Sequence, residues 1–266
     1  GTFNGSITSE TTYTYTITTN GSCQTMSSSG NITVKPEDEL ALDPLSNANQ
    51  IICEGGTINT INYNIGGGTN SASIAWDLPN GAPSGIIFDP STMTISGQVT
   101  NNINTVTTYT YTITTNGSCT NQSETGTITV NPDGEFINTT NNQNQIICEG
   151  EPITDIIYQI AGGATNATVN ALPNGLSFDF PTSDTLRIYG TPSDNINTST
   201  VMTYDISTTG SGSCNEENLT GAITVNQINT IAFDAAASNY NSASPTVCEG
   251  ETLDLKFNLG DGATNA

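Results

Sequence analysis

Cysteine is the residue type whose spacing most clearly points to chemistry in this sequence. There are six cysteines and no histidine, and no two cysteines form a CxxC pair, so a zinc site is not expected. Cysteine pairs are typical of oxidising compartments outside the cytosol. We therefore expect structural disulfides in an exported protein. The six are Cys23, Cys53, Cys119, Cys148, Cys214 and Cys248.

The spacing favours one pairing of these cysteines. Cys53 and Cys119 lie 66 positions apart, and so do Cys148 and Cys214. In a β-sandwich the last hairpin lies at the end where the chain enters, so a cysteine there is expected to reach the first strand of its own domain. The spacing thus predicts two intradomain disulfides, Cys53–Cys119 and Cys148–Cys214.

Two cysteines remain, and Cys23 and Cys248 are expected to pair outside this sequence. A rival scheme joins sequence neighbours and would staple adjacent domains. The next domain is expected about 30 Å from the hairpin, at about 3.3 Å per strand residue, so intradomain pairing is preferred. The rival pairs are Cys23–Cys53, Cys119–Cys148 and Cys214–Cys248.

Carboxylates could bind a metal between the expected domains. Ca²⁺ takes about six to eight oxygen ligands. The acidic groups between domains differ from one another and lack the dense pattern of a calcium linker. Solvated charge is therefore expected, no cofactor is required, and Ca²⁺ is the alternative. The groups are Glu37–Glu39 with Asp43, Asp133 with Glu135, and Asp234.

Two further residue sets suggest carbohydrate chemistry. Asp179 and Asp184 could form the carboxylate pair of a glycosidase, but the preceding repeat keeps only Asp89. Trp76 could stack on a sugar ring, yet it is in phase with apolar neighbours, which favours packing. No catalytic residues are expected, and the chain is not expected to be an enzyme.

Composition excludes several partners. The chain has 3 basic and 25 acidic residues, a formal net charge of −22. So few cations cannot follow a phosphate backbone, and the charge is repelled by anionic membranes. No apolar run approaches the roughly 18 residues of a membrane-spanning helix, so direct membrane insertion is not expected.

A repeat sets the architecture. Thr11–Cys23 and Thr107–Cys119 share the letters TTYTYTITTNGSC at an offset of 96, and Asn49–Gly55 and Asn144–Gly150 both read NQIICEG at an offset of 95. A period near 95 residues matches a sandwich domain, and we expect a stretch of a longer repetitive chain. The expected parts are the C-terminal part of repeat 1 (1–35), complete Ig-like domains at 36–131 and 132–227, and the N-terminal part of repeat 4 (228–266).

Each repeat has a strand pattern. Tyr109, Tyr111 and Ile113 alternate with threonines, which places one apolar face toward a core. About seven such short strands, separated by turn residues, occur in each repeat, and no stretch has a helical period. The pattern predicts an all-β fold, a tandem array of Greek-key β-sandwich domains.

One block resembles a known family. Leu172–Asp179 (LPNGLSFD) followed by Leu186–Pro192 (LRIYGTP) resembles the LPxGLxFD…xIxGTP signature of bacterial Ig-like, cadherin-like domains. Leu78–Gly81 and Thr94–Gly97 carry a weaker copy, with an insertion and with Gln-Val in place of Thr-Pro. The whole repeat is similar to repeats of giant Bacteroidota surface adhesins, among them those of flavobacterial gliding motility.

The resemblance implies a function and a location. It implies an extended adhesive stalk on the surface of a Gram-negative bacterium, exported by the type IX route, whose partners are extracellular surfaces, polysaccharides and neighbouring repeats. It also implies possible O-glycosylation at Thr185, within the pattern Asp-Thr-aliphatic. The alternatives are a glycan-binding module array and the spacer of a large secreted hydrolase.

Overall fold

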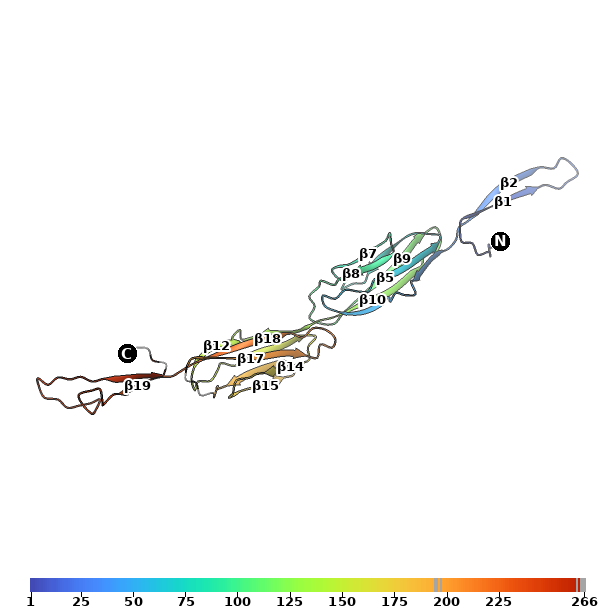
Figure 1. Ribbon diagram of the computed structural model, residues 1–266. Helices are drawn as coiled ribbons and strands as arrows, with labels where there is room; N and C mark the ends of the chain where they lie inside the picture. The colour runs from blue at the N-terminus through green and yellow to red at the C-terminus, as the bar shows by residue number, and fades with distance from the viewer. Residues whose placement is uncertain (194–195, 197, 262, 264–266) are drawn as a thin grey trace. The chain divides into compact units, whose positions relative to one another are not determined.

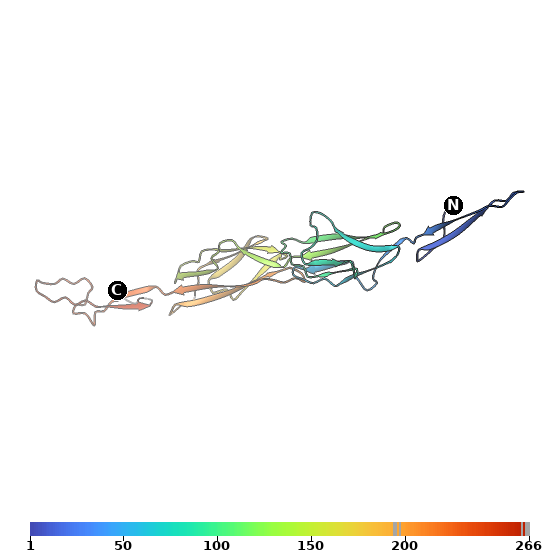
Figure 2. The same ribbon diagram turned by 90° about the horizontal axis from the view of Figure 1, so that it is seen from above.

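The structure is a computed structural model that describes residues 1–193, 196, 198–261 and 263. Every regular element in this part of the chain is a β-strand, and the strands fall into two compact units, Gly1–Pro132 and Asp133–Ala266 (Figure 1). Figure 2 shows the same strands from above. Among the described residues, no helix is long and apolar enough to cross a membrane.

The first unit begins with a lone antiparallel hairpin, β1 (Thr11–Thr18) and β2 (Ser27–Val34). Threonines face serine, threonine or asparagine across the pair, as in the hydrogen bond between the Thr12 and Thr33 hydroxyls (3.1 Å). The opposite face carries Tyr13, Tyr15 and Ile17, all exposed. This hairpin has strand structure without a core beneath it.

The rest of the first unit is a β-sandwich of two four-stranded sheets. One sheet has the order β4-β10-β9-β6 and the other β3-β5-β8-β7. The strands are β3 (Asp38–Leu42), β4 (Asn49–Cys53), β5 (Ile61–Gly67), β6 (Thr69–Trp76), β7 (Ile86–Asp89), β8 (Thr94–Gly97), β9 (Thr107–Gly117) and β10 (Ser123–Asn131).

The apolar face predicted for Tyr109, Tyr111 and Ile113 fills the core of this sandwich, and all three are buried. From the other sheet, Tyr63 brings its hydroxyl 3.1 Å from that of Tyr111, whose hydroxyl also donates to the Ala48 carbonyl (3.1 Å). Burial raises the pKa of both tyrosines, so both hydroxyls stay protonated. The pair joins the two sheets at a hydrogen-bonded point inside the core.

The second unit contains a second sandwich of the same plan. Its sheets have the orders β12-β18-β17-β14 and β11-β13-β16-β15, and a buried tyrosine, Tyr204, donates to the Gln143 carbonyl (3.1 Å). Two more strands follow the sandwich and form a hairpin. The strands are β11 (Gly134–Asn138), β12 (Asn144–Cys148), β13 (Ile156–Gly162), β14 (Asn166–Asn170), β15 (Leu176–Thr182), β16 (Thr185–Gly190), β17 (Thr200–Thr209), β18 (Asn218–Asn226), β19 (Asn229–Phe233) and β20 (Phe257–Asp261).

The all-β tandem fold expected from the sequence is confirmed. Eight strands in each described sandwich replace the seven expected, because the chain makes an extra short strand before it changes sheets. That strand, β3, begins inside the acidic segment Glu37–Glu39, which was expected to be a solvated linker. Asp38 is 3% exposed, so the expectation of solvated charge is wrong at this residue.

Candidate functional site: the ends of the two sandwich domains

At the N-terminal end of the first sandwich, the loop between β9 and β10 lies against the incoming chain. Cys119 Sγ is 3.7 Å from the carbonyl oxygen of Lys35, and Lys35 Nζ is 3.3 Å from the Ser118 hydroxyl. One residue farther on, the Thr120 N–H donates to Glu37 Oε2 (3.0 Å). These contacts place Cys119 beside the segment that enters the domain.

A buried carboxylate fixes the base of this loop. Asp38 Oδ2 accepts a hydrogen bond from the Thr115 hydroxyl (2.9 Å), whereas Oδ1 is buried and has no hydrogen-bond partner among the described residues. Gly117 allows this approach, since a Cβ there would overlap Asp38 Oδ1. The loop that carries Cys119 is therefore anchored by a side chain from the opposite sheet.

The second sandwich also anchors its last hairpin loop with a carboxylate, but that carboxylate comes from the loop itself and not from the opposite sheet. Gly134 occupies the register position of Asp38, because it pairs with Gly162 as Asp38 pairs with Gly67. The carboxylate here comes from Glu216, which accepts hydrogen bonds from the Ser211 N–H and hydroxyl (2.9 Å each). Burial raises the pKa of Glu216, but these bonds outweigh it and hold the pKa below its usual value.

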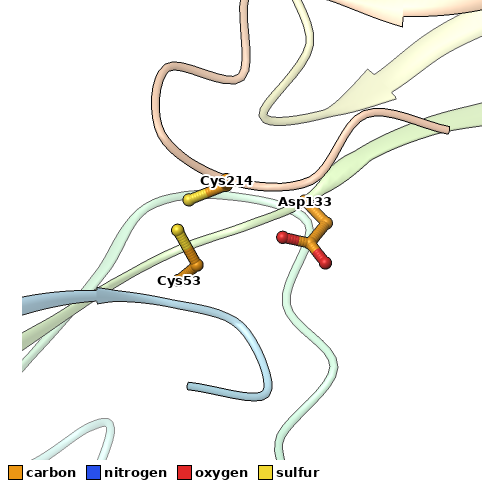
Figure 3. A group of neighbouring side chains, drawn as sticks. All are labelled: Cys53, Asp133 and Cys214. Carbon is orange, nitrogen blue, oxygen red and sulfur yellow. The ribbon is translucent and has the colours of Figure 1, made fainter. Parts of the chain in front are cut away.

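Cys214 lies inside the loop that Ser211 and Glu216 close. The next residue, Asn215, donates from its backbone N–H (3.0 Å) and its side chain (2.8 Å) to the Asp133 carboxylate. In return, the Gly134 N–H donates to the Asn215 carbonyl (2.8 Å). Cys214 is thereby held beside the first residues of its own domain, and Figure 3 shows it near Asp133.

The other two cysteines of the sandwiches lie at the C-terminal ends. Strand β4 runs parallel to β10, with Cys53 paired to Asn131, and the Glu54 N–H donates to the Asn131 carbonyl (2.8 Å). In the second sandwich, β12 runs parallel to β18 and Cys148 pairs with Asn226. Each of these cysteines therefore lies beside the residue at which the chain leaves its domain.

The predicted disulfides Cys53–Cys119 and Cys148–Cys214 are absent from this geometry. Between the two cysteines of the first sandwich runs β10, whose eight steps of about 3.3 Å span about 26 Å, against a Cα separation of at most about 7 Å for a disulfide. The expectation was right about the hairpin and wrong about the first strand. Strands β3 and β4 together carry the chain to the far end, where Cys53 lies.

The oxidation states agree with this geometry. Cys53 and Cys214 are disulfide-bonded, whereas Cys119 and Cys148 are free thiols. The rival neighbour scheme fails for the same reason, since it requires Cys119 to be bonded. Cys23 and Cys248 are free and exposed here, and their pairing outside this sequence stays a prediction. A sulfur in a disulfide is no thiolate, so neither Cys53 nor Cys214 is available as a metal ligand.

Most of the acidic residues considered for Ca²⁺ serve as local hydrogen-bond acceptors. Asp43 accepts from the Leu45 N–H (2.9 Å), and Asp234 accepts from the N–H groups of Ala236 and Ala237 (3.0 and 2.9 Å). Both Asp133 oxygens accept from Asn215. These bonds explain why acidic residues occur at these positions without invoking an ion.

Asp179 and Asp184 lack the properties of a catalytic pair. Asp179 accepts two hydrogen bonds from Arg187 (3.0 and 2.6 Å), and these lower its pKa. Asp184 accepts from the Thr182 hydroxyl (2.6 Å) in the turn between β15 and β16, which lowers its pKa as well. A glycosidase requires one carboxyl group with a raised pKa to act as the acid, and neither residue fits.

The structure bears on the prediction made for Trp76 but not on the one made for Thr185. The Trp76 ring packs on Tyr111, with ring centroids 5.3 Å apart, and lies against the core, as its phase predicted. The Thr185 hydroxyl, at the start of β16, is within hydrogen-bond distance of Thr182 (2.7 Å) and Asp184 (3.4 Å). O-glycosylation of Thr185 stays a prediction.

Comparisons with known proteins support the fold. Residues 46–133 match the family described as "Putative Ig domain". The chain contains Ig-like repeats. No curated protein matches the chain.

Solved structures with tandem domains are similar to the chain at a low level. The protocadherin gamma-B4 extracellular domain has 15% identity over 84% of this chain and a TM-score of 0.39, and the chain spans 38% of its length. A structure of three tandem titin Ig domains has 12% identity over 87% of this chain and 90% of its own, with a TM-score of 0.39. Likeness at this level carries no information about partners.

Proposed function

We propose that this chain is a structural and adhesive segment of a secreted surface fibre, in which the repeats act as a stalk. One observation carries the proposal. In each sandwich the chain enters at one end and leaves at the other. Lys35 lies beside the β9–β10 loop, and Asn131 lies at the far end of β10. A domain with its two ends opposed adds its full length to a tandem array.

The chemistry of the surface supports a mechanical rather than a catalytic role. The acidic candidates act as local hydrogen-bond acceptors or pair with Arg187, and the half-buried Trp76 ring packs on Tyr111 at the edge of the core. A net charge of −22 opposes sideways association of exposed sheet edges. These features favour a stalk over the glycan-binding array, for which Trp76 was the best candidate contact.

The location and lineage belong to the same proposal. Ig-like repeats with a disulfide suit an extracellular compartment. The whole repeat is similar to repeats of Bacteroidota adhesins, from which we infer the surface of a Gram-negative bacterium, export by the type IX route and a contribution to gliding or attachment.

Immunogold labelling of intact source cells tests this proposal. Antibodies raised against residues 36–227 should decorate thin filaments that project from the cell surface, and brief protease treatment of intact cells should remove the label together with attachment to polysaccharide-coated glass. Label confined to the cell interior, or to compact soluble particles in the medium, would contradict it. Attachment that survives complete loss of the label would remove the adhesive part and leave the stalk.

A further inference from the structure

We propose that the outer face of the sheet β4-β10-β9-β6, in the first sandwich, binds an extended neutral polysaccharide through threonine hydroxyls. The inference rests on the proposed adhesive role, for which it names the surface and the class of ligand. All of the residues that form the surface belong to the first unit, Gly1–Pro132. We call this surface the threonine face of the first sandwich.

The threonine face consists of the side chains that point away from the core, all of them half-buried or exposed. Tyr111 and Ile113 of β9 point into the core, so the residues that alternate with them point outward, each opposite an outward residue of β10. Neighbouring strands lie about 4.8 Å apart and alternate residues of one strand about 6.7 Å apart, so the hydroxyls form a close array. The members are Thr108, Thr110, Thr112 and Thr114 of β9 and Ser123, Thr125, Thr127 and Thr129 of β10, flanked by Asn49 and Ile51 of β4 and by Ser71, Ser73 and Ala75 of β6.

None of these members carries a charge, although the chain has 25 acidic residues and a net charge of −22. The other sheet of the same sandwich differs, because alternation places Glu39 of β3 and Asp89 of β7 on its outer face. Asp77 follows β6 and donates its backbone N–H to the Thr110 carbonyl (3.0 Å), which places it at the border of the threonine face. The surrounding charge repels an anionic ligand, whereas a neutral ligand meets no such barrier on this face.

The hydroxyls at the centre of the face are available to a ligand. The hydroxyls of Thr110, Thr112 and Thr125 make no hydrogen bond to any described residue, although Thr112 and Thr125 are directly opposite each other. At the two ends of the face, by contrast, opposite hydroxyls bond to each other, at 3.1 and 3.0 Å. The end pairs are Thr108 with Thr129 and Thr114 with Ser123. A hydroxyl both donates and accepts, so each central threonine can form a hydrogen bond of either sense.

The equivalent faces of the other repeats lack this combination. In the hairpin β1–β2, four successive cross-strand pairs each make a side-chain hydrogen bond of 2.8–3.1 Å, so those hydroxyls are already used. In the second sandwich, Asp205 stands where the first has Thr112, and its carboxylate accepts from the Thr220 hydroxyl (2.6 Å). Ala222 stands where the first has Thr127. Among the described residues, only the first sandwich joins an uncharged face to free central hydroxyls.

An extended neutral polysaccharide matches this face. A pyranose ring carries hydroxyls on neighbouring carbons with C–H groups between them, and a threonine presents a hydroxyl beside a methyl group. Hydroxyls on both sides donate and accept, so sugar and protein can satisfy each other. A polymer can lie along a broad face that has no pocket, and binding without ion pairs is insensitive to salt. The half-burial of Trp76 does not oppose this mode, because it uses no aromatic stacking.

The test measures how much of the full chain is depleted from solution by insoluble cellulose, chitin or curdlan, with alginate-coated beads as the acidic comparison. Thr112→Asp gives the first sandwich the residue of the second, and Thr125 can then bond to it as Thr220 bonds to Asp205. The reciprocal variant, Asp205→Thr with Ala222→Thr, gives the second sandwich the residues of the first. Each domain folds with its own residue at this position, so both variants should fold, and the urea midpoint by Trp76 fluorescence checks Thr112→Asp.

We expect the parent chain to adsorb to at least one of the neutral polysaccharides, equally at low and high salt, and not to alginate. Thr112→Asp should weaken adsorption at least about tenfold, because a sugar hydroxyl would have to displace the water of a carboxylate and the free Thr125 hydroxyl would be lost. The reciprocal variant should adsorb more strongly than the parent, because it has two such faces. If Thr112→Asp folds poorly, the reciprocal variant decides alone, and no gain would overturn the proposal.

Three other results would overturn it as well. A parent chain that adsorbs to no neutral polysaccharide, or only to alginate, would exclude the ligand class and leave the stalk to be judged on intact cells. Equal adsorption of the parent and Thr112→Asp would exclude this face and leave the adhesive role to another surface. Sedimentation that shows self-association of the parent, abolished in Thr112→Asp, would assign the face to a second copy of the chain.

Discussion

The same thirteen residues, TTYTYTITTNGSC, occur twice and have opposite surroundings. In the copy Thr107–Cys119, Tyr111 and Ile113 are 0% exposed, whereas in the copy Thr11–Cys23 the corresponding Tyr15 and Ile17 are 45% and 66% exposed. Both copies form a strand paired with the strand that follows. The strand pairing is therefore the same in both copies, whereas, among the described residues, only the copy at Thr107–Cys119 has a second sheet packed against its apolar face.

The largest difference between the copies should come from their isoleucines. Ile113→Ala removes a fully buried side chain, and the cavity should lower the free energy of unfolding of the first sandwich by about 2–5 kcal/mol. Ile17→Ala, the matched change in the exposed copy, should change it by less than about 0.5 kcal/mol. Urea unfolding followed by the fluorescence of Trp76, the single tryptophan, reports on this sandwich alone. Equal effects of the two changes would refute the comparison.

The glycine opposite each central tyrosine should give the next largest difference. A Cβ at Gly126 would overlap the Tyr111 ring and approach the Ala48 carbonyl to 2.5 Å, so Gly126→Ala should cost about 1–3 kcal/mol through overpacking. Gly30→Ala should be nearly neutral, because the Tyr15 ring that it meets is exposed and can move away. The same fluorescence measurement checks both, and a neutral Gly126→Ala would show that the core tolerates the shift.

Alkaline pH should affect the buried copy selectively. Burial, with the hydrogen bond to Tyr63, raises the pKa of Tyr111 above its ordinary value of 10.0. Between pH 10 and the raised pKa, this tyrosine ionises in the unfolded state but stays protonated in the folded state. Its contribution to the free energy of unfolding is therefore complete below pH 10 and is lost as the pH rises toward the folded pKa. The urea midpoint of the first sandwich should therefore fall steadily above about pH 10. Tyr111→Phe should flatten that slope; an unchanged slope would assign it to other groups.

The threonine face should show the smallest effect of all. The Thr108 and Thr129 hydroxyls and the Thr12 and Thr33 hydroxyls each make one exposed cross-strand hydrogen bond of 3.1 Å. Thr108→Ala should change the unfolding free energy of the first sandwich by no more than about 0.5 kcal/mol. Thr12→Ala should leave it unchanged. A typical protein hydrogen bond contributes about 0.5–1.5 kcal/mol to stability. A loss above about 1 kcal/mol for Thr108→Ala would therefore mean that this exposed threonine pair contributes more than a surface hydrogen bond usually does.

The tandem β-sandwich fold was predictable because the 95-residue repeat indicates the domains and the period-two alternation of apolar residues indicates their strands. The alternation at Tyr109–Ile113 identified a strand and its buried face, and the phase of Trp76 with Ile74 and Leu78 identified it as a packing residue. Strand β3 was missed because its first residue, Asp38, is acidic. The signal was available in Asp38, Leu40 and Leu42, which alternate with polar or small residues, but a buried carboxylate is too rare to expect without its partner Thr115.

The cysteine pairing could not be predicted, for a topological reason. The outcome depends on which end of the sandwich the strand with Cys53 reaches, and that depends on the parallel pairing of β4 with β10. Spacing along the chain does not encode the direction of a sheet crossover. The exchange of Asp38 for Glu216 between the two domains was hidden in the same way. Asp38 lies in β3 and accepts from Thr115, whereas Glu216 lies in the loop between β17 and β18 and accepts from Ser211.

Single-molecule stretching of the chain under reducing conditions tests the central claim, that the repeats form a load-bearing stalk, most directly. Each of the two sandwiches should resist extension and then unfold in a step of its own. At about 3.3–3.6 Å per residue, the fully unfolded chain of 266 residues should reach about 880–960 Å. A chain that reaches this extension smoothly, without two separate unfolding steps, would contradict the account.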